Sequence, residues 1–197
     1  MGQPDVIILP GSKGVADDIE RLRKSGLFDA VKHSPAYLVG ICGGLQILGE
    51  KLLDPEGVES EQSEAMGLKL LPLITRMNRK KTLRHTGSKV RDCLPVYGYE
   101  IHHGETHCTN KNGISVMHSP DGREIGYETE RIFATYLHGV FDDDAFRRHF
   151  LNAIRRRKGW EPLTVQTEYG FEKALNRLAD HVRSRIDLKK LYRKMGL

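Results

Sequence analysis

A cysteine at a strand-to-helix junction is the first residue in this sequence that could carry chemistry. Cys42 lies in the segment GICGG, residues 40–44, which fits the pattern G-x-C-x-G at the end of an apolar run. A nucleophile in this pattern sits on a sharp turn, and the glycines let neighbouring elements approach it closely. The helix that follows should lower the thiol pKa, and the Gly43 N–H should face a developing oxyanion. The pattern predicts a nucleophilic thiol; the alternative is a small buried cysteine in a tight turn.

Two further segments predict the rest of an acyl-transfer site. The segment LPGSK, residues 9–13, also ends a strand in a glycine turn, so it can offer a second backbone N–H at the same sheet edge. A thiol nucleophile needs a base. Of the nine histidines, His138 in ATYLHGVF is expected to end a strand just before a glycine and a helix start. Cys42 and His138 are therefore the predicted catalytic pair.

A cluster of histidines raises the alternative of a metal site. His102, His103 and His107 lie together with Cys108 in EIHHGETHC. Adjacent strand residues point to opposite faces, and no second Cys or His pair lies at the spacing of zinc ligands. We therefore expect no metal.

The elements that must position these residues follow an α/β pattern. DVIIL (5–9) and YLVGI (37–41) are typical of buried strands, and segments 15–25 and 45–53 are typical of helices. This alternation predicts a parallel α/β sheet. From residue 67 to 138, strand-like segments joined by turns predict an antiparallel or mixed region, with a hairpin turn at Asp121-Gly122.

The C-terminal part of the chain is expected to be helical. Residues 142–157 begin with acidic and end with basic side chains, which suits a helix dipole. Apolar residues then recur at three- and four-residue steps from Phe171 to Ile186, which predicts one long amphipathic helix. We expect a domain over residues 1–159 and an amphipathic extension over 160–197 that packs on this domain or on a partner domain.

Composition limits the remaining possibilities. Hydrophobic residues make up 39% and charged residues 29% of the 197 residues, which fits one globular domain with a core. The sequence shows no membrane-spanning run and no signal peptide, and its three cysteines cannot all pair, so we expect a protein of the reducing cytoplasm. The net charge of +5 is not accompanied by a nucleic-acid-binding motif. We therefore expect neither a nucleic acid nor a membrane as partner.

Five motifs together resemble a known family. VIILPGSKG, GICGGLQILGE, GLKLLPLIT, YGYEIHHGET and TYLHGVFDD occur in this order. They resemble the glutamine amidotransferase domain of cobyric acid synthase, a class I (triad-type) glutaminase of the cobalamin-synthesis branch. The resemblance runs from residue 5 to about residue 191. It implies a flavodoxin-like α/β fold, with a mixed, largely parallel sheet flanked by helices.

The resemblance also implies roles for individual residues. Cys42 would attack the carboxamide of glutamine, and His138 would shuttle protons. Backbone N–H groups near Gly11, Ser12 and Gly43 would hold the oxyanion. A further residue, Gln46, one helical turn after the nucleophile, matches the position that grips the substrate glutamine.

The sequence departs from the family pattern at the third member of the triad. The acid usually found two residues after the catalytic histidine is replaced by Val140. The cobalamin branch commonly lacks this acid too, so we expect a Cys-His dyad. Glu100 and His102 are candidates for supporting the imidazole, although both can equally be ordinary strand residues.

The sequence departs from the family at its start as well. A strand–helix–strand stretch and an ATP-binding domain normally precede the ILPGS strand, and the chain has no G-x-x-x-x-G-K-[ST] phosphate loop. We therefore expect no cofactor in this chain, with ATP and Mg²⁺ on a synthetase domain or subunit. The chain would be a fragment of the synthase or a separate glutaminase subunit.

The expected function is supply of ammonia, by glutamine hydrolysis, for ATP-dependent amidation of corrin-ring carboxylates. The synthetase partner would bind the corrinoid polycarboxylate substrate. The first alternative is the glutaminase subunit of another amide ligase, such as one acting on cell-wall lipid precursors. A catalytically silent scaffold and a cysteine peptidase or chaperone-like relative are further alternatives.

Overall fold

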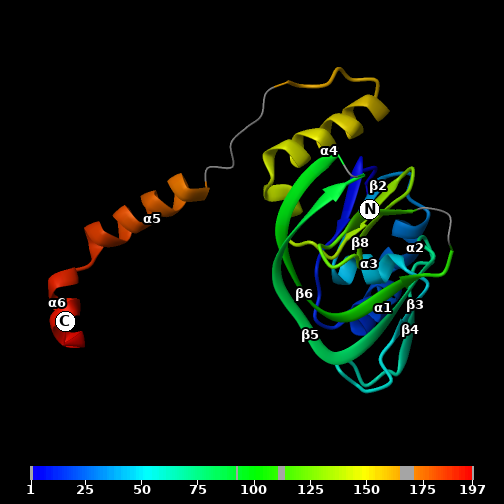
Figure 1. Cartoon of the computed structure of the whole chain (residues 1–197), viewed down its shortest axis with the longest axis horizontal. Helices are drawn as coiled ribbons and strands as arrows, with labels where there is room; N and C mark the ends of the chain where they lie inside the picture. Colours follow the sequence, from blue (N-terminus) through cyan, green and yellow to red (C-terminus); the bar gives the residue numbers. More distant parts are fainter. Residues whose placement is uncertain (1, 92, 111–113, 165–170, 197) are drawn as a thin grey trace. The chain divides into compact units, whose positions relative to one another are not determined.

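The computed structural model describes residues 2–91, 93–110, 114–164 and 171–196 (Figure 1). The chain divides into two compact units, Met1–Thr164 and Val165–Leu197, which are described separately below. The division falls slightly beyond residue 159, where the sequence predicted the end of the first domain. All the predicted site residues lie in the first unit.

A five-stranded sheet forms the centre of the first unit. Its strand order is β1-β2-β9-β8-β7. The strands are β1 (Val6–Leu9), β2 (Tyr37–Ile41), β7 (Ser115–His118), β8 (Glu124–Glu128) and β9 (Ile132–Thr135). β1, β2 and β9 run parallel, whereas β8 pairs with both β9 and β7 in antiparallel fashion. The segments that follow β1, β2 and β9 therefore emerge at one edge of the sheet, which is the edge predicted to carry the site.

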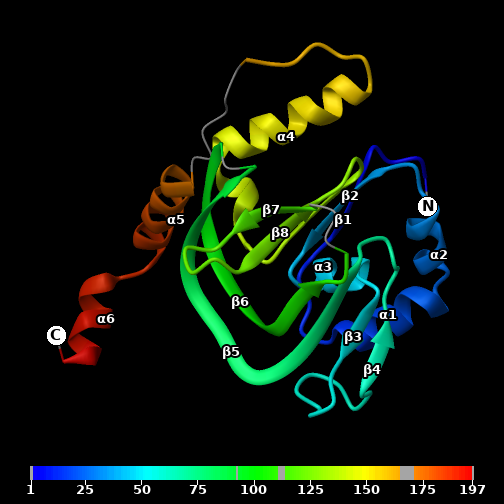
Figure 2. The ribbon, with the colours of Figure 1, turned by 45° about the vertical axis from the view of Figure 1, so that its right-hand side comes forward.

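A second sheet has the strand order β4-β3-β5-β6. The strands are β3 (Lys51–Leu53), β4 (Glu64–Met66), β5 (Leu73–Val90) and β6 (Leu94–Cys108). β5 and β6 form a long curved antiparallel pair (Figure 2), whose register shifts between Met77 and Thr82. The fold is thus the predicted mixed α/β type. Parallel pairing among the described residues is confined to β1, β2 and β9 and to the pair β3–β5.

Helices cover both faces of the five-stranded sheet. They are α1 (Val15–Lys24), α2 (Leu27–Lys32), α3 (Gly43–Leu48), the short 3-10 helix η1 (Val140–Asp142) and α4 (Asp144–Arg157). On α4, Phe150 packs edge-on against Tyr37 of β2, and Phe146 packs against Phe133 of β9. The Asp143 side chain caps α4 by accepting the Phe146 N–H at 2.7 Å. The helices predicted over 15–25 and 142–157 are therefore confirmed, apart from their ends.

The helix predicted over residues 45–53 is wrong in its second half. α3 ends at Leu48, and residues 51–53 form β3, whose Lys51 pairs with Ile74 of β5. Gly49 leaves the helix in an extended conformation, and a Cβ at this position would lie 2.8 Å from the Leu73 carbonyl oxygen. Pairing with a strand that is distant in sequence thus decides the conformation of a segment whose local pattern suits a helix.

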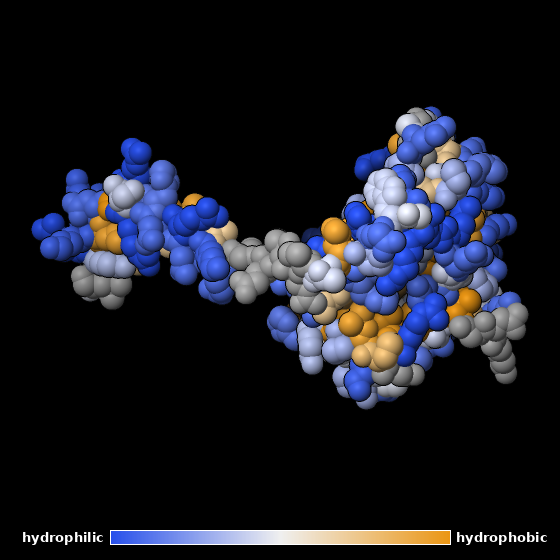
Figure 3. Space-filling view, turned by 90° about the horizontal axis from the view of Figure 1, so that it is seen from above, coloured by the Kyte–Doolittle hydropathy of each residue, from blue (hydrophilic) through white to orange (hydrophobic). Residues whose placement is uncertain are grey.

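The helix predicted from Phe171 to Ile186 is present in the second unit, and the described residues contain a further helix after it. α5 (Phe171–Arg185) is followed by α6 (Leu188–Met195), and the Asp187 side chain caps α6 by accepting the Lys190 N–H at 3.0 Å. Apolar side chains of this unit are exposed, as the orange groups among the blue surface of Figure 3 illustrate; they are Leu175, Leu178, Val182, Ile186, Leu191, Tyr192 and Met195. The expectation that they pack on the first domain or on a partner stays a prediction. Among the described residues, no helix is long and apolar enough to cross a membrane.

Candidate active site

Cys42 occupies the turn between β2 and α3. Its backbone has φ 51° and ψ −104°, a conformation that residues other than glycine rarely adopt. The Cys42 N–H donates to the Thr135 carbonyl at 2.8 Å, so the turn is tied to the end of β9. The side chain is buried, and its thiol lies 3.7 Å from the Ile101 carbonyl oxygen of β6. Backbone strain held in place by the surrounding sheet is characteristic of a nucleophile turn.

The glycines around Cys42 are required by close contacts. A Cβ at Gly40 would lie 2.6 Å from the Leu48 side chain, and a Cβ at Gly44 would lie 1.9 Å from the Leu9 carbonyl oxygen. These contacts confirm the prediction that glycines let neighbouring elements approach the turn.

The segment after β1 lies directly against the nucleophile turn. A Cβ at Gly43 would lie 2.8 Å from the backbone nitrogen of Ser12. The Ser12 hydroxyl donates to the Asp18 carboxylate and accepts the Gly14 N–H at 3.1 Å, which fixes the loop. Two backbone segments, one with the Gly43 N–H and one with the Ser12 N–H, thus meet beside Cys42, as the two predicted oxyanion loops require.

His138 follows β9 and reaches the same place. A Cβ at Gly11 would lie 3.2 Å from His138 Cε1 and 3.9 Å from the Cys42 Cβ, so Gly11 is in contact with both predicted catalytic residues. Nε2 of His138 is buried and, within the described part of the chain, has no hydrogen-bond partner. A buried polar nitrogen without a partner in this position is available to exchange a proton with a reacting group.

Cys42 and His138 open into one cleft of about 680 Å³. Six of the residues predicted from sequence line it: Gly11, Ser12, Cys42, Gln46, His102 and His138. The other lining residues are Lys13, Val58, Glu59, Lys81, Ile101 and His103. The residues that line the cleft therefore come from six regions of the chain. The sequence predicted the regions around Gly11, Cys42 and His138, and it named His102 as a candidate in a fourth.

Burial favours the uncharged form of both predicted catalytic groups. It raises the pKa of the Cys42 thiol to about 11, against the opposing effect of the Gly43 N–H. Burial, together with the nearby charge of His102, lowers the pKa of His138 below its usual range. The expectation of a lowered thiol pKa is thus wrong. α3 has only six residues and the thiol is removed from water, so desolvation outweighs the helix end.

Gln46 lies at the back of the cleft and is held by a buried polar chain. Its Nε2 donates to the Tyr136 hydroxyl at 3.1 Å, and this hydroxyl lies 2.6 Å from the Thr106 hydroxyl. Its Oε1 is buried without a partner among the described residues. The side chain is therefore fixed by the protein at its nitrogen, and its carbonyl oxygen is free to accept a hydrogen bond from a ligand.

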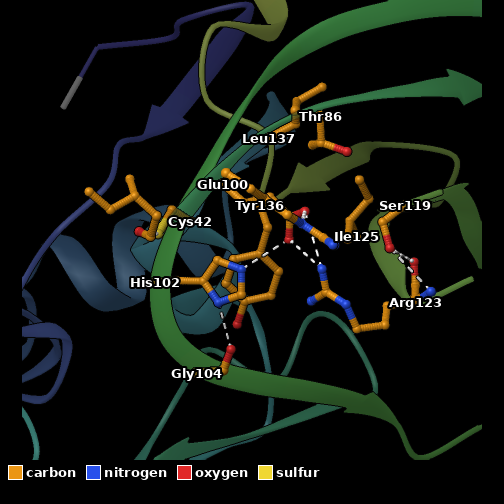
Figure 4. A network of polar contacts seen from close by, with 12 residues as sticks. Cys42, Thr86, Glu100, His102, Gly104, Ser119, Arg123, Ile125, Tyr136 and Leu137 are labelled. Atoms are coloured by element: carbon orange, nitrogen blue, oxygen red, sulfur yellow. Dashed lines mark hydrogen bonds and ion pairs between the residues drawn. The ribbon is translucent and has the colours of Figure 1, made fainter. Parts of the chain in front are cut away.

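Glu100 and His102 belong to a charged network next to the cleft (Figure 4). The Glu100 carboxylate is fully buried and accepts from Arg84 Nε at 2.8 Å and from Arg123 Nη2 at 3.2 Å. His102 Nε2 lies 3.2 Å from the same carboxylate, and its Nδ1 lies 2.7 Å from the Gly104 carbonyl oxygen. The hydrogen bonds of Glu100 thus hold His102, which forms part of the cleft wall, and do not reach the imidazole of His138.

The remaining histidines of EIHHGETHC, His103 and His107, contact different parts of β5. His103 Nδ1 lies 3.1 Å from the Asn78 carbonyl oxygen, whereas His107 pairs with Ile74 further along β5. Across the described residues, no group of three His, Cys, Asp or Glu side chains is arranged to hold a metal ion.

Sequence reasoning missed Glu59 and Lys81. Glu59 lies in the loop between β3 and β4, which the side chain of Asp54 holds by accepting the N–H of Glu59 at 2.9 Å. Lys81 lies in the stretch of β5 where the register shifts. A β-bulge changes the direction in which side chains point next to active sites. No local pattern in the sequence predicts this bulge.

Comparison with known proteins agrees with this geometry. The family model described as CobB/CobQ-like glutamine amidotransferase domain matches residues 1–146. The chain is 40% identical over 205 residues to the adenosylcobalamin biosynthesis bifunctional protein CobDQ of Leptospira interrogans serogroup Icterohaemorrhagiae serovar Lai, an alignment that covers 100% of this chain and 24% of that protein. It is 38% identical over 239 residues to a cobyric acid synthase of Nitratidesulfovibrio vulgaris, covering 100% of this chain and 44% of that protein.

The chain thus spans less than half the length of these curated relatives. A solved structure described as a glutamine amidotransferase superposes with a TM-score of 0.56 at 17% identity, over 76% of this chain and 79% of that one. This likeness supports the fold, and the family match over residues 1–146 supports the assignment of the sequence. The chain belongs to the CobB/CobQ-like glutamine amidotransferase domain family.

Proposed function

We propose that this chain hydrolyses glutamine with Cys42 as nucleophile and His138 as base. The observation that carries the proposal is the meeting of both residues at Gly11, next to a nucleophile turn with φ 51° at Cys42. The ammonia released would serve ATP-dependent amidation of corrin-ring carboxylates in cobyric acid synthesis. The reaction would take place in the cytoplasm.

The chemistry starts from an uncharged pair. As the sulfur of Cys42 attacks the carboxamide carbon, His138 accepts the thiol proton, because its lowered pKa keeps it neutral beforehand. The N–H groups of Gly43 and Ser12 stabilise the oxyanion of the tetrahedral intermediate. His138 then returns the proton to the leaving nitrogen, and ammonia departs from a glutamyl thioester. Water, deprotonated by His138, hydrolyses the thioester to glutamate and restores the thiol.

The cleft carries charges that suit the head group of a free amino acid. Glutamine presents an α-ammonium and an α-carboxylate, and the cleft wall contains one acidic side chain, Glu59, beside Lys81 and Lys13. Burial raises the pKa of Glu59, which disfavours its charged form. Binding of an ammonium group would restore that charge, so we assign Glu59 to the α-ammonium and Lys81 to the α-carboxylate of glutamine.

Amidation requires a partner. The chain spans less than half of its curated relatives, and it contains no G-x-x-x-x-G-K-[ST] phosphate loop. We assign the binding of ATP, Mg²⁺ and the corrinoid polycarboxylate to an ATP-dependent synthetase domain or subunit. The alternative is a glutaminase that serves another amide ligase, such as one acting on cell-wall lipid precursors. The names of the two curated relatives, both of cobalamin synthesis, favour the corrinoid.

A labelling experiment tests the glutaminase site directly. The chain is treated with a glutamine-analogue electrophile, with and without excess glutamine or asparagine, and the modified peptides are mapped by mass spectrometry. We expect one adduct, on Cys42, that glutamine prevents and asparagine does not. Cys93, which is exposed, and Cys108 serve as internal controls. Labelling of Cys42 that excess glutamine does not prevent would contradict the proposal. Labelling of Cys93 in preference to Cys42 would contradict it as well.

A further inference from the structure

The position that normally carries the third catalytic group holds an apolar side chain here. Val140, two residues after His138, is buried at 1% exposure. Glu100 hydrogen-bonds His102, Arg84 and Arg123, so its carboxylate is engaged elsewhere. Within the described structure, the imidazole of His138 therefore receives no hydrogen bond from a carboxylate, and something else must fix its plane.

The aromatic ring of Tyr99 lies against that imidazole. The two ring centroids are 5.0 Å apart and the planes differ by 10°, so the rings are stacked. The backbones of the two residues are joined as well: the His138 N–H donates to the Tyr99 carbonyl at 2.8 Å, and the Tyr99 N–H donates to the His138 carbonyl at 3.1 Å. This isolated bridge connects the segment after β9 to β6.

Gly98, the residue of β6 before Tyr99, explains how the two segments come so close. A Cβ at Gly98 would lie 2.0 Å from the His138 carbonyl oxygen, so only glycine permits this approach. Tyr99 is thus carried to His138 by the backbone itself. On its other side, Tyr99 meets the edge of His85 of β5 at 6.4 Å.

We propose that Tyr99 is the positioning residue of the catalytic histidine: its ring holds the plane of the His138 imidazole and stabilises the imidazolium that forms when the thiol proton is accepted. The inference rests on the proposed function, which gives His138 the role of proton carrier. The negative face of an aromatic ring attracts a cation, and a stacked ring resists rotation of its neighbour. Tyr99 would thereby perform both tasks usually ascribed to a triad carboxylate.

The charges around His138 make such stabilisation useful. The other titratable groups that line its cleft are Cys42, Lys13, Glu59, Lys81, His102 and His103. Three of them are histidine or lysine side chains on β5 and β6, and His102 opposes a positive charge on His138. Among the described residues of that lining, Glu59 is the one carboxylate. An electron-rich ring stacked on the imidazole counters this largely basic surrounding without adding a carboxylate.

The test compares three variants of the full chain: Tyr99→Leu, Tyr99→Phe and, as matched control, Tyr97→Leu. Tyr97 lies two residues away on the same face of β6, is 69% exposed and pairs with Gly87. The pKa of His138 is followed by NMR of its Cε1–H, assigned with a His138→Gln variant. We expect Tyr99→Leu to lower this pKa by roughly 0.5–1 unit, and Tyr99→Phe and Tyr97→Leu to leave it unchanged.

Kinetics with the synthetase partner provide the second readout. We expect Tyr99→Leu to lower kcat for glutamine roughly threefold to tenfold with little change of KM. Because a histidine with a lower pKa stays neutral at lower pH, the acidic limb of the rate profile should move to lower pH. Tyr99→Phe should retain the wild-type rate.

Two results would overturn the proposal. One is a His138 pKa that is the same in Tyr99→Leu as in Tyr97→Leu; the other is a Tyr99→Phe variant as impaired as Tyr99→Leu. Should Tyr99→Leu fail to fold, pentafluorophenylalanine at position 99 keeps the ring shape and reverses its charge distribution, and it must then lower the His138 pKa. The NMR measurement needs no glutaminase activity, so failure of Cys42 labelling by the glutamine analogue would reject the proposed function alone.

Discussion

The backbone of Gly44 lies against the carbonyl group of Leu9, so closely that a Cβ on Gly44 would come within 1.9 Å of the carbonyl oxygen. This contact joins the start of α3 to the end of β1. It therefore fixes the nucleophile turn relative to the loop that carries Gly11 and Ser12. The position of the Cys42 side chain depends on this backbone contact as much as on the turn itself.

We predict that Gly44→Ala destabilises the protein. The added methyl group has no space, and overpacking of this kind costs about 1–3 kcal/mol of the free energy of unfolding. Gly14→Ala is the matched control, because a Cβ there meets nothing closer than 3.7 Å, and its change should stay within about 0.5 kcal/mol. Urea unfolding of both variants measures the difference. Equal stability of the two variants would show that the Gly44 contact relaxes without cost.

The parts of the site that sequence predicted are those specified locally. Cys42 and its glycines announce a strand-to-helix turn within five residues, and the turn was found there with its expected close contacts. His138 was predicted from the end of a strand and the glycine that follows it. In each case a short segment determines where the functional atom lies, since the end of a parallel strand fixes the edge of the sheet.

The parts that sequence did not predict depend on pairing between distant segments. β3 forms because Lys51 meets Ile74, and Lys81 reaches the cleft through the register shift between Met77 and Thr82. Tyr99 reaches His138 by a bridge between β6 and the segment after β9. The thiol pKa was predicted with the wrong sign because burial of Cys42, unlike the helix that follows it, cannot be seen in a local pattern.

Replacement of the nucleophile should affect amidation from glutamine but not amidation from free ammonia. We predict that Cys42→Ala, in the complete enzyme with its synthetase, lowers glutamine-dependent amidation by about 10³-fold or more and leaves ammonia-dependent amidation intact. Cys93→Ala is the control, because Cys93 is an exposed free thiol outside the cleft. Product formation from each nitrogen source is measured under identical conditions. Equal loss with glutamine and ammonia would refute the role assigned to Cys42.

The assignment of Glu59 to the head group of glutamine predicts a selective change in KM. Glu59→Gln removes a charge-assisted hydrogen bond of about 1.5–3 kcal/mol to the α-ammonium, so KM should rise roughly tenfold to a hundredfold with kcat nearly unchanged. Glu61→Gln, in the same loop and exposed, should leave KM unaltered.

Alkylation of Cys42 by iodoacetamide provides a check on the integrity of the cleft. This small reagent has no amino-acid head group, so Glu59→Gln should react at the wild-type rate. If alkylation slows together with the rise in KM, the substitution has disturbed the cleft, and Glu59 does not act through the head group.

The buried network of Glu100 predicts how stability depends on acid. Burial opposes the ionisation of Glu100, but hydrogen bonds from His102 and Arg84 outweigh it and lower the pKa of this carboxyl below 4.5. A carboxyl with a lowered pKa in the folded state contributes stability above its unfolded pKa, and that contribution is lost as the pH falls through the folded value. We therefore expect the free energy of unfolding of the wild-type chain to decrease when the pH is lowered below about 4.5.

Glu100→Gln isolates this contribution. The variant removes the buried carboxylate that Arg84 and Arg123 share, while both guanidinium groups keep their ion pairs with Asp121. It should be less stable at pH 7 by about 1–3 kcal/mol, since both arginines are partly exposed. Because the glutamine does not titrate, the gap to the wild type should close as the pH falls below 4.5. Denaturant unfolding from pH 7 to pH 3 measures the gap, with Glu105→Gln on the same strand as control. A gap that stays constant over this range would mean that the charge of Glu100 does not support the cleft wall at His102.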